Sequence, residues 1–439
     1  MNAPDLSPIA YPIDDLVRED RVHKRLYNDA EIFRLEMERV FGRAWLYIGH
    51  ESQVAKPGDY LTAYMGLQPV ILVRHQDGGL HVLHNRCAHR GAMICTDARG
   101  NTGKSFYCGY HGWTYKTNGE LLAVPMKRAY AGRYDLKCGD FGLPRVPRVS
   151  VYRGFVFASL APAAEPHPDL ETYLGIGKQC IDKIVDRSPA GEIDLNGGVQ
   201  KYVVRANWKT QVENLNDAYH PPFSHECTAD ENKRQFKRRP GDNAGPLLSS
   251  DEHQSVWDAM EMVAFDYGNS YCGPLPFNHT ARGGPLFEAH RAALLKRHSA
   301  EKVEEILTDN FHNLILYPNV VMQLASNHVR TVRPIAVDRT EIRIYPIRLK
   351  GVPEEMNRQL IRYLNITHSA ASLIQTDDVE MFRRVQGGLE SDGAPWVWFN
   401  RYMDDEATIP GARSGIGTSE LVMRNQYRAY RDYMAGAAV

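Results

Sequence analysis

Two short segments of the chain each pair a cysteine with a histidine, a combination that binds metals. The first reads Cys87-Ala-His89-Arg-Gly and the second reads Cys108-Gly-Tyr-His111-Gly-Trp, and eighteen residues separate His89 from Cys108. Two thiolates on one iron and two neutral imidazoles on the other define a Rieske [2Fe–2S] centre, which transfers electrons. The spacing therefore predicts such a cluster on these four residues.

Zinc is the alternative metal for this set, and it would make the chain a zinc-stabilised ligand-binding protein. Structural zinc sites also use two cysteines and two histidines. Zinc fingers, however, pair like residues within each arm, whereas here each arm is mixed. Gly91 and Gly112 follow the two histidines, and glycine lets backbone N–H groups come close to sulfur. These features favour the iron–sulfur cluster.

A second group of residues offers two imidazoles and a carboxylate, the donor set of an open iron(II) site. His220 and His225 are five residues apart, so on an ideal helix they would point about 140° away from each other. We expect a helix from Asn207 to His225 that is bent by Pro221 and Pro222, so that both imidazoles converge. Taken alone, the spacing also suits two structural histidines, and the cluster motif upstream is what favours a metal.

The carboxylate of this group is chosen by helical phase. Asp378 shares a predicted helix face with three apolar residues: Phe382, Val385 and Leu389. A carboxylate on an apolar face is costly to bury unless it is paired or bound to a cation. Asp378 is therefore the predicted third ligand, while its neighbour Asp377 falls off that face. A salt bridge from Asp378 to an arginine remains open.

Asp217 lies three residues before His220, where an acid can orient an imidazole ligand, cap a helix or line the fold. One chain that carries an electron-transfer cluster and an oxygen-activating iron is most simply an oxygenase.

The composition of the chain is that of an ordinary globular protein. Its 439 residues exceed one small core, so two domains are expected. The net charge of −1 argues against nucleic-acid binding, and no apolar run reaches the length of a membrane span. No secretory signal is visible and the seven cysteines form no disulfide framework, which favours a reducing cytoplasm. Five cysteines are expected to be buried free thiols: Cys95, Cys138, Cys180, Cys227 and Cys272.

Strand patterns broken by turns predict a small antiparallel β domain over residues 45–165. Strands are expected at 69–74, at 80–84 and on both sides of a turn at 117–119, with both Cys/His segments at hairpin tips. Three prolines within 161–168 indicate the boundary of this domain.

The rest of the chain mixes helical and strand patterns. The expected elements are a helix with a capping signal at Asn28, a loop or lid at 237–286, two or three strands within 314–348, one or two helices within 353–389 and a terminal helix at 422–434.

With both groups in hand, the chain resembles the α (large) subunit of Rieske non-haem iron aromatic ring-hydroxylating dioxygenases. The resemblance is carried by Cys-Ala-His-Arg-Gly, Cys-Gly-Tyr-His-Gly-Trp, Asn-Trp-Lys, Asp-Ala-Tyr-His before a second histidine, and Asp-Asp-Val-Glu. It implies an α+β fold, with an antiparallel β Rieske domain at 45–165. Residues 1–44 and 166–439 would form a helix-grip catalytic domain with an antiparallel sheet. In such motifs the second acid of Asp-Asp is the iron ligand, in agreement with the helical phase of Asp378.

The resemblance also implies an assembly. Family members form head-to-tail trimers in which the cluster of one subunit lies beside the mononuclear iron of its neighbour. Asp217 would then bridge its own His220 and His111 of the partner subunit. Many relatives have three residues between Asn214 and this acid, whereas this chain has two, which leaves the role of Asn214 open. A homotrimer is expected, with or without a β subunit (α3 or α3β3).

The implied activity is cis-dihydroxylation of an aromatic ring with O2 and electrons from NAD(P)H, in aromatic compound catabolism. A reductase would supply the electrons, directly or through a ferredoxin. The resemblance leans towards aromatic acids, whose carboxylate Arg330 or Arg333 could bind, although arginines are more commonly at the surface. A Rieske monooxygenase or O-demethylase is the close alternative. Pocket or ordinary core positions are expected for Phe223, Met322, Leu324 and His328.

Overall fold

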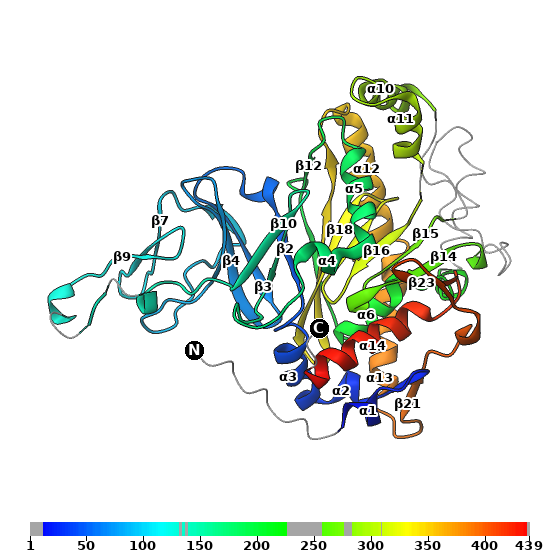
Figure 1. Ribbon diagram of the computed structural model, residues 1–439, viewed down its shortest axis with the longest axis horizontal. Coiled ribbons are helices and arrows are strands. Elements are labelled where there is room, and N and C mark those ends of the chain that lie inside the picture. The colour runs from blue at the N-terminus through cyan, green and yellow to red at the C-terminus, as the bar shows by residue number, and fades with distance from the viewer. Residues whose placement is uncertain are drawn as a thin grey trace. The chain divides into compact units, whose positions relative to one another are not determined.

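The computed structural model describes residues 12–130, 134–136, 139–225, 257–275, 283–308 and 310–436. The chain divides into two compact units (Figure 1). The first contains Phe41–Leu170, and the second contains Glu171–Val439 together with the N-terminal segment that ends at Val40. Among the described helices, none has the length and apolar character that crossing a membrane requires.

The first unit consists of antiparallel β structure, as predicted. It holds three sheets, in the strand orders β10-β11-β2, β5-β4-β3-β6 and β7-β8-β9. The strands are β2 (Leu46–His50), β3 (Asp59–Met65), β4 (Gln68–Arg74), β5 (Leu80–His84), β6 (Arg99–Asn101), β7 (Ser105–Tyr107), β8 (Thr114–Lys116), β9 (Leu121–Ala123), β10 (Arg148–Tyr152) and β11 (Phe155–Ser159). Short 3-10 helices lie at Glu51–Val54, Lys127–Tyr130 and Gly139–Phe141.

The predicted turn at 117–119 is confirmed as the connection between β8 and β9. The Lys116 N–H donates to the Glu120 carbonyl at 2.8 Å, and Gly119 has a φ of 93°. A Cβ on Gly119 would meet the Leu143 carbonyl oxygen at 2.7 Å, so glycine is needed there for conformation and for space.

Only one of the two Cys/His segments lies at a hairpin tip. The segment that starts at Cys108 connects β7 with its neighbour β8, as predicted. The prediction is wrong for the segment that starts at Cys87, because β5 and β6, on either side of it, occupy opposite edges of their sheet. Sequence proximity indicated a hairpin, but β3 and β4 lie between these two strands.

The second unit is built on a nine-stranded antiparallel sheet in the order β13-β19-β18-β17-β16-β15-β14-β23-β22. Its strands are β13 (Gln200–Val204), β14 (Glu261–Ala264), β15 (Ser270–Gly273), β16 (Asn313–Leu316), β17 (Val320–Gln323), β18 (His328–Ala336), β19 (Arg339–Pro346), β22 (Ala407–Ile409) and β23 (Ala412–Ile416). Two small pairs accompany it: β1 (Arg21–His23) with β21 (Trp396–Trp398), and β12 (Ile193–Asp194) with β20 (Arg348–Leu349).

Helices surround this sheet, and α6, α12, α13 and α14 contact its strands (Figure 1). The helices are α1 (Ile13–Leu16), α2 (Arg25–Asn28), α3 (Ala30–Arg39), α4 (Leu170–Leu174), α5 (Lys178–Asp186), α6 (Trp208–Leu215), α7 (Pro221–Ser224), α10 (Pro285–Leu294), α11 (Ala300–Leu307), α12 (Glu354–His368), α13 (Gln375–Gly388) and α14 (Leu421–Ala435). Further 3-10 helices lie at Gly175–Gly177, Asp266–Gly268 and Met403–Asp405. The antiparallel sheet with helices agrees with the predicted fold class.

Several local predictions are corrected. The 314–348 region forms four strands, β16 to β19, because its apolar run continues through a turn at 317–319. Part of the predicted loop at 237–286 is the β14–β15 hairpin, and much of the remainder lies outside the described residues. The cap of α3 is Asp29 and not Asn28, since the Asp29 carboxylate accepts from the N–H groups of Glu31 and Ile32. The helices predicted within 353–389 and at 422–434 are confirmed.

The helix expected from Asn207 to His225 is two helices. Asn207 caps α6, its side chain accepting from the Lys209 N–H, and α6 ends at Leu215. Pro221 and Pro222 then open α7, where proline is tolerated because first-turn N–H groups have no intrahelical partner. The prolines therefore start a new helix instead of bending an old one.

A buried polar group fixes the start of α6. Glu36 of α3 is fully buried and accepts hydrogen bonds from Trp208 Nε1 at 2.8 Å and from the Tyr430 hydroxyl at 2.9 Å. Lys209 Nζ forms an ion pair with the same carboxylate. Three helices, α3, α6 and α14, are thereby joined beneath the segment that carries the predicted iron ligands.

Candidate functional site

The two Cys/His segments adopt the same loop closure. In the first, the Cys87 N–H donates to the Ala92 carbonyl and the Gly91 N–H donates to the Cys87 carbonyl, at 2.8 and 2.9 Å. The second repeats this pattern from Cys108, with Trp113 and Gly112 as partners, again at 2.8 and 2.9 Å. The two glycines have φ values of 75° and 73°, which favour glycine over any other residue.

The four predicted cluster ligands are brought together by these loops. Cys87 and Cys108 are buried in one apolar core cluster. The rings of His89 and His111 lie 4.5 Å apart between centroids, and the His89 ring stacks on Trp113 at 5.0 Å with an interplanar angle of 1°. Nδ1 of His89 is buried and has no hydrogen-bond partner among the described residues, as expected of a nitrogen that binds a metal. Two buried thiols and two adjacent imidazoles fit a Rieske cluster.

Tyr115 is a residue of this site that the sequence did not reveal. Its hydroxyl accepts from the Ala88 N–H at 3.2 Å and lies 3.0 Å from Cys87 Sγ, so its single proton is directed at the sulfur. Burial, followed by the hydrogen bond to Cys87, raises the pKa of Tyr115, which keeps this proton on the oxygen. Hydrogen bonds to ligand sulfur raise the potential of a cluster.

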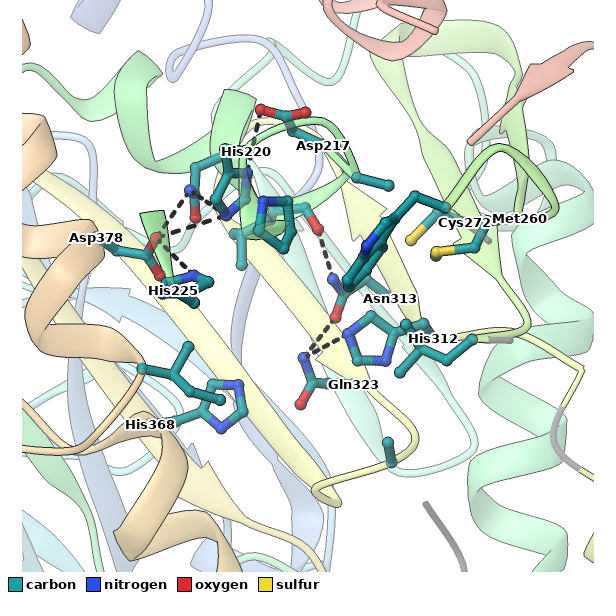
Figure 2. Close-up of a pocket in the computed structure, with 18 of the residues that line it drawn as sticks. Asp217, His220, His225, Met260, Cys272, His312, Asn313, Gln323, His368 and Asp378 are labelled. Carbon is teal, nitrogen blue, oxygen red and sulfur yellow. Dashed lines mark hydrogen bonds and ion pairs between the residues drawn. The ribbon is translucent and has the colours of Figure 1, made fainter. Parts of the chain in front are cut away.

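The second predicted group is also assembled (Figure 2). One ligand atom each from His220, His225 and Asp378 lies within 4.8 Å of the others. The Nε2 atoms of His220 and His225 lie 3.6 and 3.4 Å from the same oxygen, Asp378 Oδ1. His220 and His225 come from the two ends of α7, and Asp378 comes from the first turn of α13. Two imidazoles and one carboxylate that converge in this way suit a non-haem iron and leave positions open for other ligands.

Each of these histidines contacts a second acid through its other nitrogen. His220 Nδ1 lies 3.1 Å from Asp217, and His225 Nδ1 lies 3.3 Å from Asp377. Such carboxylates fix the tautomer and the orientation of an imidazole ligand. Helical phase predicted the inward position of Asp378 but passed over Asp377, because an acid that supports a ligand from outside need not lie on the buried face.

Asn214 lies between the same ligands. Its amide nitrogen is 3.1 Å from His220 Nε2 and 3.1 Å from Asp378 Oδ1. The two-residue spacing to Asp217 therefore places both side chains at the site. Although burial alone would raise the pKa of Asp378, the hydrogen bond with His225 and the nearby positive charges hold it below its usual value. Asp378 is thus an anion, ready to bind a cation.

A cavity of about 120 Å³ adjoins this group. His220, His225 and Asp378 lie on one side of it, and His312, Asn313 and Gln323 lie on the other (Figure 2). Among the residues predicted to line it, Arg330 does so. Phe223 is 67% exposed, and a set of residues that are buried do not line the cavity: Met322, Leu324 and His328.

The structure also separates the two candidate arginines. Arg333 is 3.5 Å from Glu341, so its charge is already compensated. Arg330 is 1% exposed, lines the cavity, and its Nε has no hydrogen-bond partner among the described residues. The negative charge of Asp378 acts on this guanidinium, and an anionic group on a ligand would further offset the cost of burying it.

Comparisons with known proteins cover nearly the whole chain. A family model for the Rieske [2Fe-2S] domain matches residues 44–147, and one for the ring hydroxylating alpha subunit (catalytic domain) matches residues 193–436. The chain is 34% identical to toluate 1,2-dioxygenase subunit alpha of Pseudomonas putida, over 87% of this chain and 83% of that one. It is 33% identical to the 2-halobenzoate 1,2-dioxygenase large subunit of Burkholderia cepacia, over 86% and 78%. It is similar to the structure of naphthalene 1,2-dioxygenase with indole bound in the active site, with a TM-score of 0.81, 26% identity and coverage of 96% and 93%.

Proposed function

Because the chain belongs to the family of ring-hydroxylating dioxygenase α subunits, we propose that it cis-dihydroxylates the ring of an aromatic acid. It is an oxidoreductase, the terminal oxygenase subunit, with a Rieske [2Fe–2S] cluster in one domain and a mononuclear non-haem iron in the other. Residues 45–165 are proposed as the Rieske domain, and residues 1–44 with 166–439 as the catalytic domain.

The proposed ligands follow from the donor sets. Cys87 and Cys108 would hold one iron of the cluster and His89 and His111 the other. The mononuclear iron would be held by three further residues: His220, His225 and Asp378. When bound, the cluster supplies single electrons and the mononuclear iron activates O2.

The surrounding residues hold and orient these ligands. Asp217 would fix the Nδ1–H of His220 and connect it to His111 of the partner subunit in a head-to-tail homotrimer, while Asp377 fixes the Nδ1–H of His225. The role of Asp377 is supported by the 3.3 Å distance between its carboxylate and His225 Nδ1, a contact within one chain.

The aromatic acid is supported above all by Arg330. A carboxylate on the substrate would form charge-assisted hydrogen bonds with its guanidinium and offset the cost of burying that charge. The cavity of about 120 Å³ is also close to the engineered cavity of about 150 Å³ that binds benzene, so it suits a single ring. The relatives named for toluate and 2-halobenzoate agree with such a substrate.

The proposed partners are a reductase that draws electrons from NAD(P)H, with or without a ferredoxin, and a β subunit in an α3β3 assembly or none in an α3 assembly. We place the protein in the cytoplasm because the described cysteines that are not proposed ligands, Cys95, Cys180 and Cys272, form no disulfide, as expected in a reducing compartment.

The test uses the iron- and sulfide-loaded protein with a reductase and NADH, supplied with 18O2. With benzoate as the substrate, we expect a product that carries two 18O atoms, both from the same O2. A product with a single labelled oxygen would show that the reaction is monooxygenation or demethylation and not dioxygenation. A preparation that holds zinc in place of iron would contradict the proposal that the protein is an oxygenase.

Arg330→Met tests the substrate class. We expect kcat/KM for benzoate to fall about 100-fold, because the carboxylate loses its charge-assisted partner, whereas kcat/KM for toluene, which has no carboxylate, should change little. Arg333→Met is the matched control, since Arg333 is held by Glu341, and it should leave benzoate turnover near that of the unmodified protein. Equal losses on benzoate and toluene would show that Arg330 supports the fold and does not anchor a carboxylate.

A further inference from the structure

The cavity lies against one face of the nine-stranded sheet. Cys272 of β15 pairs in register with Asn313 of β16, which pairs with Gln323 of β17. Residues opposite one another in an antiparallel sheet point to the same face, and all three line the cavity. These side chains therefore form a row along the floor of the cavity, across three neighbouring strands.

The chemistry of this floor changes from one strand to the next. Gln323 Nε2 donates to Asn313 Oδ1 at 2.9 Å, and Asn313 Nδ2 donates to the Leu215 carbonyl, so both amides have partners within the protein. Cys272 instead presents a thiol. Burial raises the pKa of this thiol to about 12, which keeps it neutral. The floor therefore passes from polar amides to an uncharged sulfur.

The cavity continues beyond the amides into an apolar end, whose residues come from β14, β15 and the segments that flank them. They are Trp257, Met260, Met262, Cys272 and Leu275. None of these five side chains carries a charge. Figure 2 shows the sulfur atoms of Met260 and Cys272 on the side of the cavity away from His225 and Asp378. The proposed iron ligands and these two sulfur atoms thus lie at opposite ends.

Arg330 lies at the other end of the floor. It comes two residues after His328, the partner of Gln323 on β18, so its side chain points to the same face of the sheet. Burial lowers the pKa of Arg330, while the nearby Tyr202 and Asp378 act against this, which places the guanidinium near the proposed iron ligands. Because adjacent strands are about 4.8 Å apart, Cys272 on β15 and Arg330 on β18 are about 14 Å apart at the backbone.

We propose that Met260 and Cys272 are specificity-determining residues that contact a compact apolar substituent on the substrate. The substrate class is then an aromatic acid with a methyl group or a halogen para to its carboxylate. With the carboxylate on Arg330, the ring lies along the floor and its para carbon faces the apolar end. This inference rests on the proposed function, because it takes Arg330 as the carboxylate anchor.

The size and the chemistry of the apolar end support such a substituent. A cavity of about 120 Å³ holds one ring and leaves little further space, so the substituent must be small. Methionine is flexible and polarisable, and it adapts to groups of irregular shape. Sulfur is a weak hydrogen-bond partner, so a hydroxyl group placed against Met260 and Cys272 would lose its hydrogen bonds to water. A methyl group or a halogen has no such bonds to lose, and it gains from leaving water.

The experiment measures substrate preference in the reconstituted holoenzyme, with two acids competing in one reaction. The ratio of their kcat/KM values then does not depend on how much of the preparation is active. We expect 4-methylbenzoate and 4-chlorobenzoate to exceed benzoate about tenfold. The isomer 2-methylbenzoate and the polar analogue 4-hydroxybenzoate should both be poorer than 4-methylbenzoate. Equal kcat/KM values for all these acids, or a preference for the 2-methyl or the 4-hydroxy compound, would overturn the proposal.

Met260→Ala should shift the preference towards longer substituents. The change opens space at the apolar end, so kcat/KM for 4-propylbenzoate should rise about tenfold relative to that for 4-methylbenzoate. Met322→Ala is the matched control, because Met322 is buried next to Gln323 on β17, yet it points to the opposite face and does not line the cavity. It should leave this ratio near that of the unmodified protein. Equal shifts in the two variants would show that loosening of the fold, and not contact with the substituent, sets the preference.

Two further measurements test the contact itself. Cys272→Ser exchanges sulfur for a hydroxyl oxygen and should reduce the preference for 4-methylbenzoate over benzoate, and an unchanged preference would contradict the role of Cys272. Crystals of the holoenzyme with 4-bromobenzoate give a readout that does not depend on turnover, because bromine is located by its anomalous scattering. We expect the bromine against Met260 and Cys272 and the carboxylate on Arg330. Bromine at any other place in the cavity would overturn the proposal.

Failure of this inference is distinguishable from failure of the proposed function. If toluene is oxidised and none of the aromatic acids is, the proposed aromatic-acid function fails. If the acids are oxidised but a para methyl group or halogen brings no preference over benzoate, the role of Met260 and Cys272 is overturned and the proposed function stands.

Discussion

The two proposed metal-binding groups are built in opposite ways. In the Rieske loops, each cysteine lies within three residues of its histidine, and each loop is closed by its own backbone hydrogen bonds. In the proposed iron group, Asp378 on α13 comes 153 residues after His225, and the three candidate ligands meet only when α7 and α13 pack together. The first geometry is local and the second is a product of the tertiary fold.

This difference indicates which substitutions would disrupt each group. A loop that closes on its own can hold its ligands as long as its glycines and its core contacts remain. The iron group depends on supports contributed from several elements, among them Asp217, Asn214 and Asp377. We therefore expect iron binding to be sensitive to substitutions in several separate elements, whereas cluster binding should be sensitive mainly to substitutions within its own two loops.

The largest effect is expected from His220→Ala. It removes one of the three proposed ligands, so O2-dependent product should be abolished, while the visible absorbance and the reduced EPR signal of the cluster persist. Cys108→Ser is the reciprocal variant and should lose the cluster yet still bind iron(II) in the catalytic domain. Loss of the cluster in His220→Ala would show that the two groups are not independent.

A smaller effect should separate the two outer acids. Asp377→Asn should weaken iron(II) binding about 10- to 100-fold through the orientation of His225, yet turn over normally at saturating iron. Asp217→Asn should retain both metals and lose most turnover, as expected for an electron-transfer bridge. Iron(II) titration and kcat at saturating iron measure the two quantities separately. If both variants change iron(II) affinity and kcat in the same way, the two acids have the same role, and Asp217 is not an electron-transfer bridge.

The smallest effect is expected at the cluster itself. Tyr115→Phe removes one hydrogen bond to Cys87 Sγ, and its loss should lower the midpoint potential by about 50 mV, the equivalent of about 1 kcal/mol. Tyr60→Phe is a matched control, because Tyr60 bonds to the sulfur of Cys95, which is not a proposed ligand. Protein-film voltammetry would measure the midpoint potential of the cluster in both variants. An equal shift in the two would show that the hydrogen bond from Tyr115 to Cys87 does not set this potential.

The same contrast explains what the sequence could predict. The spacing of Cys87, His89, Cys108 and His111 carries the cluster within two short motifs, and the loops assemble them as the pattern indicates. The inward position of Asp378 also followed from its phase on the helix. Its role as a ligand followed from the need of a buried carboxylate for a cation. Family, fold class and cofactors were therefore accessible from the sequence alone.

The supports of these ligands were not accessible in the same way. Tyr115, Asn214 and Asp377 act through contacts that depend on how loops and helices pack, and nothing in their local pattern distinguishes them from ordinary residues. The expected face of α13 was also only partly right. Phe382 is buried as predicted, but Gln386 completes the buried stripe, and Val385 is exposed, because the helix packs at a slightly different rotation.

The buried carboxylate of Glu36 has a practical consequence for anyone who trims this protein. The helix that carries it precedes the first unit in the chain, yet it belongs to the second, where it neutralises Lys209 at the base of α6. A truncation that begins at Phe41 would strand an ammonium group in an aromatic interior and loosen the platform beneath the iron ligands. Shortened versions made for crystallisation or immobilisation should therefore keep this helix, even though it looks like a dispensable leader.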